Sequence, residues 1–317
     1  MWVFGRSHYQ HSSIRKAARR PKSKIITTNS YKKLLTLSKD QSGVMRVDLL
    51  RGITTFKKKV SVDEIAHAVH TQDFSKIQRS IPWEDLPLSI AGALDTIGET
   101  AEMAGLISAE KLPPNMNERL RWDLQNPAIK NYIKNRTAKL VVGIQGDTQE
   151  VIQNFVARSF TESMSPLQVA RQIKGSIGLY PAQERALANY RASMIGQGVI
   201  GGKLDRMVDA QESKYLDYRS MMIARTEIRG ATNSGQLSVW KEAANQDLFD
   251  RTRAERVWVA EGPDPCDDCL AMDGVTTTLD DPWIMPDGTA VDCPPWDVHP
   301  HCYCGMELQF NVFDKEE

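Results

Sequence analysis

The fold of this chain is decided near its C-terminus by Cys266-Asp267-Asp268-Cys269 and His299-Pro300-His301-Cys302-Tyr303-Cys304. The two stretches hold four of the five cysteines, the fifth is Cys293, and the 265 residues before them contain none. Thiolates and imidazoles two or three residues apart converge readily on one tetrahedral cation, usually zinc. The loop between the stretches is rich in Pro and Gly and cannot pack a large core. We therefore expect a structural zinc ion to close this segment.

The predicted ligands are Cys266, Cys269, His299 and one of Cys302 and Cys304. A closed shell of four protein ligands is typical of a structural site, because metal catalysis needs an open coordination position. Two alternatives stay open. One is a set of reduced thiols buried in a small core, and the other is a disulfide between the same cysteines if the protein leaves the reducing cytoplasm. Because Cys293 is an additional thiol, the sequence also leaves open which four ligands close the site.

Two stretches with alternating apolar residues flank the cysteines. Residues 256–260 are rich in β-branched and aromatic side chains, and residues 303–310 place Met306, Leu308 and Phe310 on one face. This pattern predicts two paired strands that bring the two cysteine clusters together. Residues 255–310 are therefore expected to form a small β appendix closed by a Cys/His cluster.

The middle of the chain carries helix signals. Capping boxes are predicted at Ser61 and Asp147, and Ser165-Pro166 predicts a further helix start. A long helix is expected from about Lys203 to Ala244, with a break near Ser213. Together these signals predict an α+β protein with a mainly helical body, comprising a helical region over 61–146 and a bundle of antiparallel helices over 147–247.

Residues 1–60 are predicted to be a basic, extended arm. The first 39 residues contain ten basic residues and no acidic one, and too few apolar residues to offset the entropy of ordering. One interpretation is that this arm contacts the phosphates of double-stranded DNA without sequence specificity. A solvated tail, or one that packs on an acidic protein surface, is the alternative. The residues expected to make the contact are Arg15, Lys16, Arg19, Arg20, Lys22 and Lys24; an acidic tail, 311–317, ends the chain.

Several function classes are disfavoured. The chain has no run of eighteen or more apolar residues, so no membrane span is expected. It contains no His-Glu-x-x-His, the usual metalloprotease motif. Aspartates crowd the Cys266 stretch, which argues against phosphate contact there.

Arg225-Thr226-Glu227, followed by Asn233, forms a polar motif within the long predicted helix. One interpretation is a catalytic pair, with Glu227 as general base and Arg225 as an anion clamp. We favour a structural role, in which these polar residues pair with facing elements, because no nucleophile or phosphate loop accompanies them.

Taken in order, these motifs resemble those of the phage Mu F-like minor head proteins, also called phage head morphogenesis proteins. The resemblance covers about residues 149–310 and includes the helix that begins near residue 179. Two departures are Tyr303, where arginine is common between the last two cysteines, and the extra Cys293. The motifs that carry the resemblance are Ala224-Arg225-Thr226-Glu227, Asn233, an aromatic strand, Cys266-x-x-Cys269 with Gly274, and His299-Pro300-x-Cys302-x-Cys304.

The resemblance implies a non-enzymatic component of a tailed-phage virion, made in the host cytoplasm. It implies a role in head morphogenesis at or near the portal protein, with other head proteins and packaged DNA as further partners. Residues 147–310 would be the family's domain. The alternatives are a metal-dependent nuclease and a zinc-bearing nucleic-acid-binding protein. A nuclease of the histidine–asparagine–histidine type would need a helix with Asn and a second His after His299, and the sequence shows none.

Overall fold

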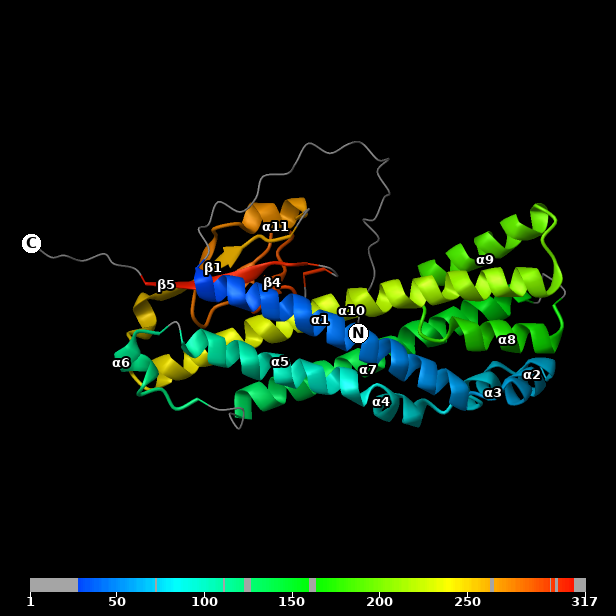
Figure 1. The fold of residues 1–317 in the computed structure, drawn as a ribbon, viewed down its shortest axis with the longest axis horizontal. Coiled ribbons are helices and arrows are strands. Elements are labelled where there is room, and N and C mark those ends of the chain that lie inside the picture. The colour runs from blue at the N-terminus through cyan, green and yellow to red at the C-terminus, as the bar shows by residue number, and fades with distance from the viewer. Residues whose placement is uncertain are drawn as a thin grey trace, which may run out of the picture. The chain divides into compact units, whose positions relative to one another are not determined.

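The computed structural model describes residues 28–71, 73–110, 112–122, 127–159, 164–262, 265–296, 298–299 and 302–310. Helices occupy most of the chain up to residue 245, and the strands follow, so the predicted α+β class is confirmed (Figure 1). The helices are α1 (Asn29–Lys59), α2 (Val62–His70), α3 (Phe74–Arg79), η1 (Trp83–Asp85), α4 (Leu86–Ser89), α5 (Ala91–Ala109), α6 (Pro114–Asn117), α7 (Pro127–Ser159), α8 (Pro166–Ser176), α9 (Pro181–Gly196), α10 (Gly201–Asn245), η2 (Arg251–Arg253) and α11 (Asp267–Met272). The strands are β1 (Ala254–Val259), β2 (Thr276–Thr278), β3 (Trp283–Ile284), β4 (Ala290–Val291) and β5 (Gly305–Phe310).

The chain forms two compact units, each assembled from segments that are far apart in sequence. Unit 1 contains Arg46–Leu94 and Arg136–Met221. Unit 2 contains the described residues of Val3–Met45, Asp95–Asn135 and Met222–Glu317. The divisions fall inside α1, α5, α7 and α10, so the boundaries expected at residues 60 and 146 do not separate the two units. Among the described residues, no helix is both long and apolar enough to cross a bilayer.

Helix α1 corrects the prediction of an extended arm over residues 1–60, because residues 29–59 are helical. Tyr31, Leu34, Met45 and Leu49 recur on one face of α1 and are fully buried. A narrow apolar face of this kind stabilises a helix through packing, even where most of the remaining residues are polar. The six residues predicted to contact DNA and the acidic tail lie outside the described residues.

Of the predicted helix starts, the one at Ser165 is confirmed, the capping box at Ser61 forms only in its Ser61 half, and the one at Asp147 is wrong. Ser61 accepts a hydrogen bond from the backbone N–H of Glu64, and Ser165 forms a full capping box with Gln168. Asp147 does not begin a helix, because it lies inside the continuous helix α7. Helix α10 is likewise unbroken at Ser213, where a break was expected.

Unit 1 contains a largely buried ion pair at Asp147, where a helix start was wrongly predicted. The carboxylate of Asp147 accepts a 2.7 Å hydrogen bond from Arg219 on α10, whose guanidinium also donates to the carbonyl of Gly178 at 2.9 Å. Gly178 has a φ of +84°, and its own N–H donates to Thr148. Burial raises the pKa of Asp147, against the opposing effect of Arg219. The turn before α9 is thus held by side chains from α7 and α10.

In unit 2, the first part of α1, α5 and the second part of α10 lie against one another. The hydroxyls of Ser38 on α1 and Thr232 on α10 are 2.8 Å apart. Three residues further along α10, Gly235 lies against the backbone of Ala101 on α5, at a distance that leaves no room for a side chain. Small residues therefore permit the close approach of these helices.

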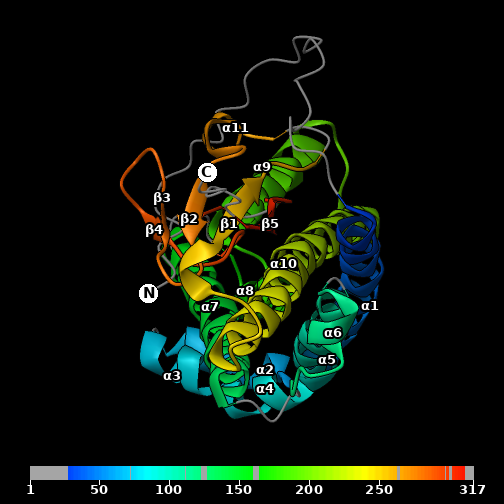
Figure 2. The same ribbon diagram turned by 90° about the vertical axis from the view of Figure 1, so that its left-hand side faces the viewer.

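The appendix contains a three-stranded antiparallel sheet in the order β2-β1-β5, as Figure 2 shows. Strand β1 pairs with β5 from Ala254 opposite Phe310 to Val259 opposite Gly305, which confirms the predicted strand pair. Strands β3 and β4 form a separate two-stranded ribbon. Buried side chains of α10, β1 and the loops, including Trp240, Trp258 and Trp283, form one apolar core that also contains four of the cysteines.

Replacing Gly235 by alanine should destabilise unit 2 by about 1–3 kcal/mol, because the new methyl group would overlap the Ala101 carbonyl. The matched control is Gly98→Ala on α5, where an added Cβ meets nothing within 4 Å. That change should stabilise the protein by about 0.5–1 kcal/mol through the lower entropy of the unfolded chain. Urea unfolding followed by circular dichroism measures both, and equal effects of the two substitutions would contradict the packing argument.

Candidate metal centre

The side chains of both cysteine stretches converge in the appendix. The Nε2 atom of His299 lies 3.1 Å from the sulfur of Cys266 and 3.3 Å from that of Cys269. The sulfur atoms of Cys269 and Cys302 are 3.6 Å apart. Ligand atoms bound to one tetrahedral zinc ion are separated by about 3.6–3.8 Å, given Zn–S and Zn–N lengths of about 2.3 and 2.1 Å. The ligand atoms of Cys266, Cys269 and His299 are therefore close enough to share one ion, and Cys302 adjoins this group through Cys269.

Local backbone structure positions two of these sulfur atoms. Cys266 is the N-cap of α11, and its sulfur accepts a hydrogen bond from the backbone N–H of Cys269 at 3.4 Å. The sulfur of Cys302 accepts one from the backbone N–H of Cys304, also at 3.4 Å. Such N–H donors stabilise a thiolate relative to a thiol. The site is thus built by a helix start on one side and the approach to β5 on the other.

The candidate ligands fall into two overlapping groups of three side chains. Cys266, Cys269 and His299 form one group that can hold a metal, and Cys269, Cys302 and Cys304 form a second that shares Cys269 with the first. We refer to these five residues as the Cys/His cluster. Cys293 belongs to neither group. All five cysteines are free thiols, so the disulfide alternative is not realised in this structure.

Burial and mutual hydrogen bonding set the charge of the cluster. A hydrogen bond with Cys269 lowers the pKa of Cys266 to about 4, and another lowers the pKa of Cys304 to about 3. The same two hydrogen bonds raise the pKa of Cys269. Cys269, Cys302 and Cys304 are nearly inaccessible to solvent. Without a cation, only some of the clustered sulfurs can ionise. A divalent cation would offset the repulsion and let the others lose their protons.

Helix α10 supports the cluster through backbone carbonyls of the cysteine loop. The Nε atom of Arg229 donates to the carbonyls of Tyr303 and Cys304 at 3.0 and 3.1 Å. One turn along, the amide nitrogen of Asn233 donates to the carbonyls of Cys304 and Pro294 at 3.1 and 2.5 Å. Both side chains are almost fully buried. They satisfy carbonyl groups that neither a helix nor a strand uses.

Two glycines permit this contact. A Cβ at Gly230, between the two donors on α10, would overlap the indole of Trp296. A Cβ at Gly305, the first residue of β5, would overlap the guanidinium of Arg229 and the ring of Tyr31. The Tyr31 hydroxyl lies 2.7 Å from a terminal nitrogen of Arg229, which donates to it. Close approach of helix and loop therefore requires glycine at both positions.

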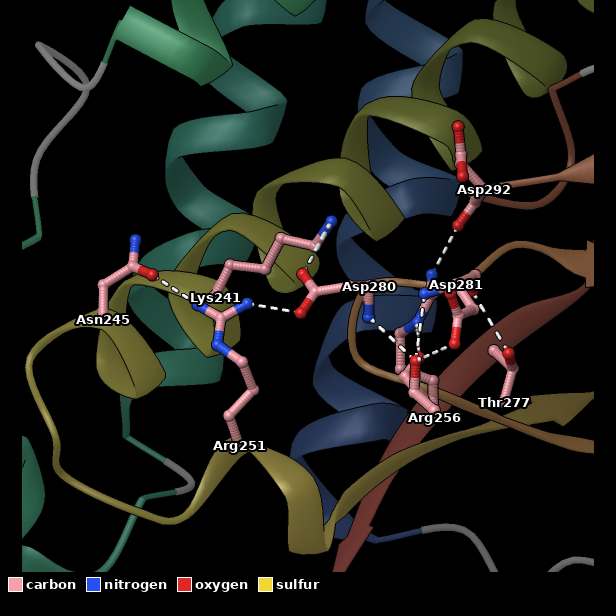
Figure 3. A network of polar contacts seen from close by, with 9 residues as sticks. Lys241, Asn245, Arg251, Arg256, Thr277, Asp280, Asp281 and Asp292 are labelled. Atoms are coloured by element: carbon pink, nitrogen blue, oxygen red, sulfur yellow. Dashed lines mark hydrogen bonds and ion pairs between the residues drawn. The ribbon is translucent and has the colours of Figure 1, made fainter.

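A second buried cation, Arg256 on β1, holds the loop between the cysteine stretches (Figure 3). Its guanidinium donates to the carbonyls of Thr278, Asp281 and Asp292, at 2.9 Å for Thr278 and 2.5 Å for Asp292. It lies over the ring of Trp283, 4.4 Å from the centroid. Burial lowers the pKa of Arg256, and nearby acidic groups oppose that shift. A guanidinium has five donors in a rigid fork, which suits it to gather three carbonyl groups at once.

The predicted polar motif is divided between different neighbours. Arg225 lies over the ring of Tyr303, 5.7 Å from the centroid, and Thr226 donates to the carbonyl of Met222 one turn earlier. Glu227 is buried, and Asn233 donates two hydrogen bonds to carbonyls of the cysteine loop. Asn233 thus pairs with a facing element, and its companion Arg229 was not identified from the sequence.

The residues that sequence reasoning missed had recognisable signals. Arg229 and Asn233 are four residues apart and share a helix face, with Gly230 beside them. Arg256 stands in an alternating strand on the same face as Trp258, where a charged residue needs buried partners. His301, the remaining histidine of the second stretch, lies outside the described residues.

Asn233→Asp should lower the free energy of unfolding by roughly 2–4 kcal/mol, because it replaces a buried donor with a carboxylate that faces two carbonyl oxygens. The control is Asn245→Asp on the same helix, where the exposed side-chain oxygen accepts from Arg251 and an aspartate can do the same. That variant should be within about 0.5 kcal/mol of the wild type. Chemical denaturation decides, and equal stability of the two variants would contradict the proposed role of Asn233.

Comparisons with protein-family models, with curated proteins and with solved structures find no match to this chain.

Proposed function

We propose that this chain is a non-enzymatic minor head protein of a tailed bacteriophage, which acts in head morphogenesis at or near the portal. The observation that carries the proposal is the resemblance of its ordered motifs to those of the Mu F-like minor head proteins. The geometry supports it in one respect. Asn233, from the helical motif, donates to the loop that carries Cys304, from the cysteine motif, so two parts of the resemblance act as one structural element.

We propose further that the metal in the Cys/His cluster is zinc. Three or four thiolates and one imidazole form a donor set that favours zinc over magnesium or calcium, which prefer oxygen ligands. The ligands would be Cys266, Cys269 and His299, which form one group, with either Cys302 or Cys304 as the fourth donor. A closed and largely buried shell supports a structural role, because no position is left for substrate.

The appendix is acidic in sequence, and the N-terminal residues are basic. Between Ala260 and Val298 the chain contains ten acidic residues and no Lys or Arg. Residues 1–27 contain seven Lys and Arg and no acidic residue. In a head protein the basic segment would bind packaged DNA without sequence specificity, and the acidic appendix would be directed away from DNA toward protein partners.

The first test is elemental analysis of the purified chain. We expect about one zinc per chain in the wild type, and loss of it in Cys269→Ser, because Cys269 belongs to both groups of the Cys/His cluster. Cys293→Ser is the matched control and should keep its zinc. Comparison of Cys302→Ser with Cys304→Ser then identifies the fourth ligand. A wild-type protein that binds no zinc yet keeps an ordered appendix would refute the zinc proposal.

The second test addresses the role in the virion. In the phage that encodes this chain, Cys266→Ser with Cys269→Ser should lower incorporation into heads at least tenfold, as measured by mass spectrometry of purified particles. Cys293→Ser should be incorporated normally. The same proteins are incubated with supercoiled plasmid and zinc or magnesium. Absence of the wild-type chain from heads would contradict the head-protein proposal, and metal-dependent cutting that Cys269→Ser abolishes would favour a nuclease.

A further inference from the structure

The turn between α9 and α10, residues 194–203, presents apolar side chains to solvent. Ile195 is 50% exposed and Ile200 is 74% exposed, at the two sides of one short turn. Single exposed apolar residues are common on protein surfaces, but here two large ones are exposed within one turn at the end of a helical hairpin. We call this segment the α9–α10 turn.

The turn holds its isoleucines in a fixed conformation. The N–H of Gly198 donates to the carbonyl of Ile195 at 2.9 Å, and that of Val199 to Met194 at 3.0 Å. Gly198 and Gly201 have φ values of +81° and +62°, which L side chains rarely adopt. Figure 1 shows the turn where α9 and α10 meet at their right-hand ends. Because hydrogen bonds of the helix cap order the backbone, the apolar side chains are presented outward.

Nothing in the described part of unit 1 crowds the backbone of the turn. A Cβ added at Gly196, Gly198 or Gly201 would meet no atom within 4 Å. Space is therefore available on several sides of the turn, and a partner can approach its backbone closely.

Positive charge surrounds the apolar residues. No acidic residue occurs between Glu184 and Asp205, a stretch that contains Arg191 and Lys203. Arg206 follows on α10, and both Lys203 and Arg206 are exposed. Asp205 is placed 3.7 Å from Arg191. The exposed turn thus combines two isoleucines with the nearby exposed cations Lys203 and Arg206.

We propose that the α9–α10 turn inserts into the interfacial region of an anionic lipid bilayer. Isoleucines enter the boundary between headgroups and acyl chains, while Lys203 and Arg206 remain at the level of the anionic headgroups. A nucleic acid would match the cations but leave the isoleucines exposed. A stable protein interface needs about 800 Å² from each partner, which is much more than two side chains supply. The lipid surface matches both the charge and the small apolar area.

The test is flotation of the full-length protein with vesicles of phosphatidylcholine containing phosphatidylglycerol. Ile195→Ser with Ile200→Ser should reduce the partition coefficient about tenfold, through loss of the inserted apolar area. Leu88→Ser is the matched control, because Leu88 is also 74% exposed but lies on α4. The basic N-terminal residues are the same in all variants, so their attraction to the vesicles cancels in this comparison.

A charge variant provides the second measurement. Lys203→Gln with Arg206→Gln should weaken binding to anionic vesicles severalfold and leave binding to pure phosphatidylcholine vesicles unchanged. Circular dichroism establishes that each variant is folded. The proposal is overturned if the wild type fails to float, if the double serine variant floats as the wild type does, or if the isoleucines instead support self-association without vesicles.

Discussion

The fold of the appendix depends on buried side chains that donate hydrogen bonds to backbone carbonyl groups of its loops. Its short strands leave long connecting loops, and a buried carbonyl without a partner costs free energy comparable to a lost hydrogen bond. Arg256 donates to three carbonyls from within the appendix, one of them at the end of β2, and Arg229 and Asn233 donate to loop carbonyls from α10. These buried side chains organise the loops.

The same donors explain why the Cys/His cluster can form. Arg229 and Asn233 both bond to the carbonyl of Cys304, while the N–H of Cys304 bonds to the sulfur of Cys302. Support of this kind around metal ligands orients them before the ion binds. The metal would then connect α11 to the approach of β5. Protein side chains hold the carbonyl-rich loops, and a bound ion would act on the sulfur-rich junction.

Buried cations also decide how the polar motif of α10 is to be understood. From the sequence alone, a pair such as Arg225 and Glu227 suggests acid–base chemistry. In the structure, Arg225 packs on an aromatic ring, and the neighbouring Arg229 donates to carbonyl oxygens. These contacts favour a structural interpretation of the motif, because Arg225 and the neighbouring Arg229 both contact residues of the cysteine loop.

Much of the local structure follows from sequence, because caps, strand alternation and ligand spacing act over a few residues. The capping residues Ser61 and Ser165, the pairing of β1 with β5 and the composition of the Cys/His cluster were all predicted in this way. Tertiary structure alone decided the remainder. Helix α1 forms because its narrow apolar face is buried, and Asp147 lies within α7 because its carboxylate pairs with Arg219 from a distant segment. The role of Arg229 depends on a loop some 75 residues later in the chain, and no local pattern encodes a contact at that separation.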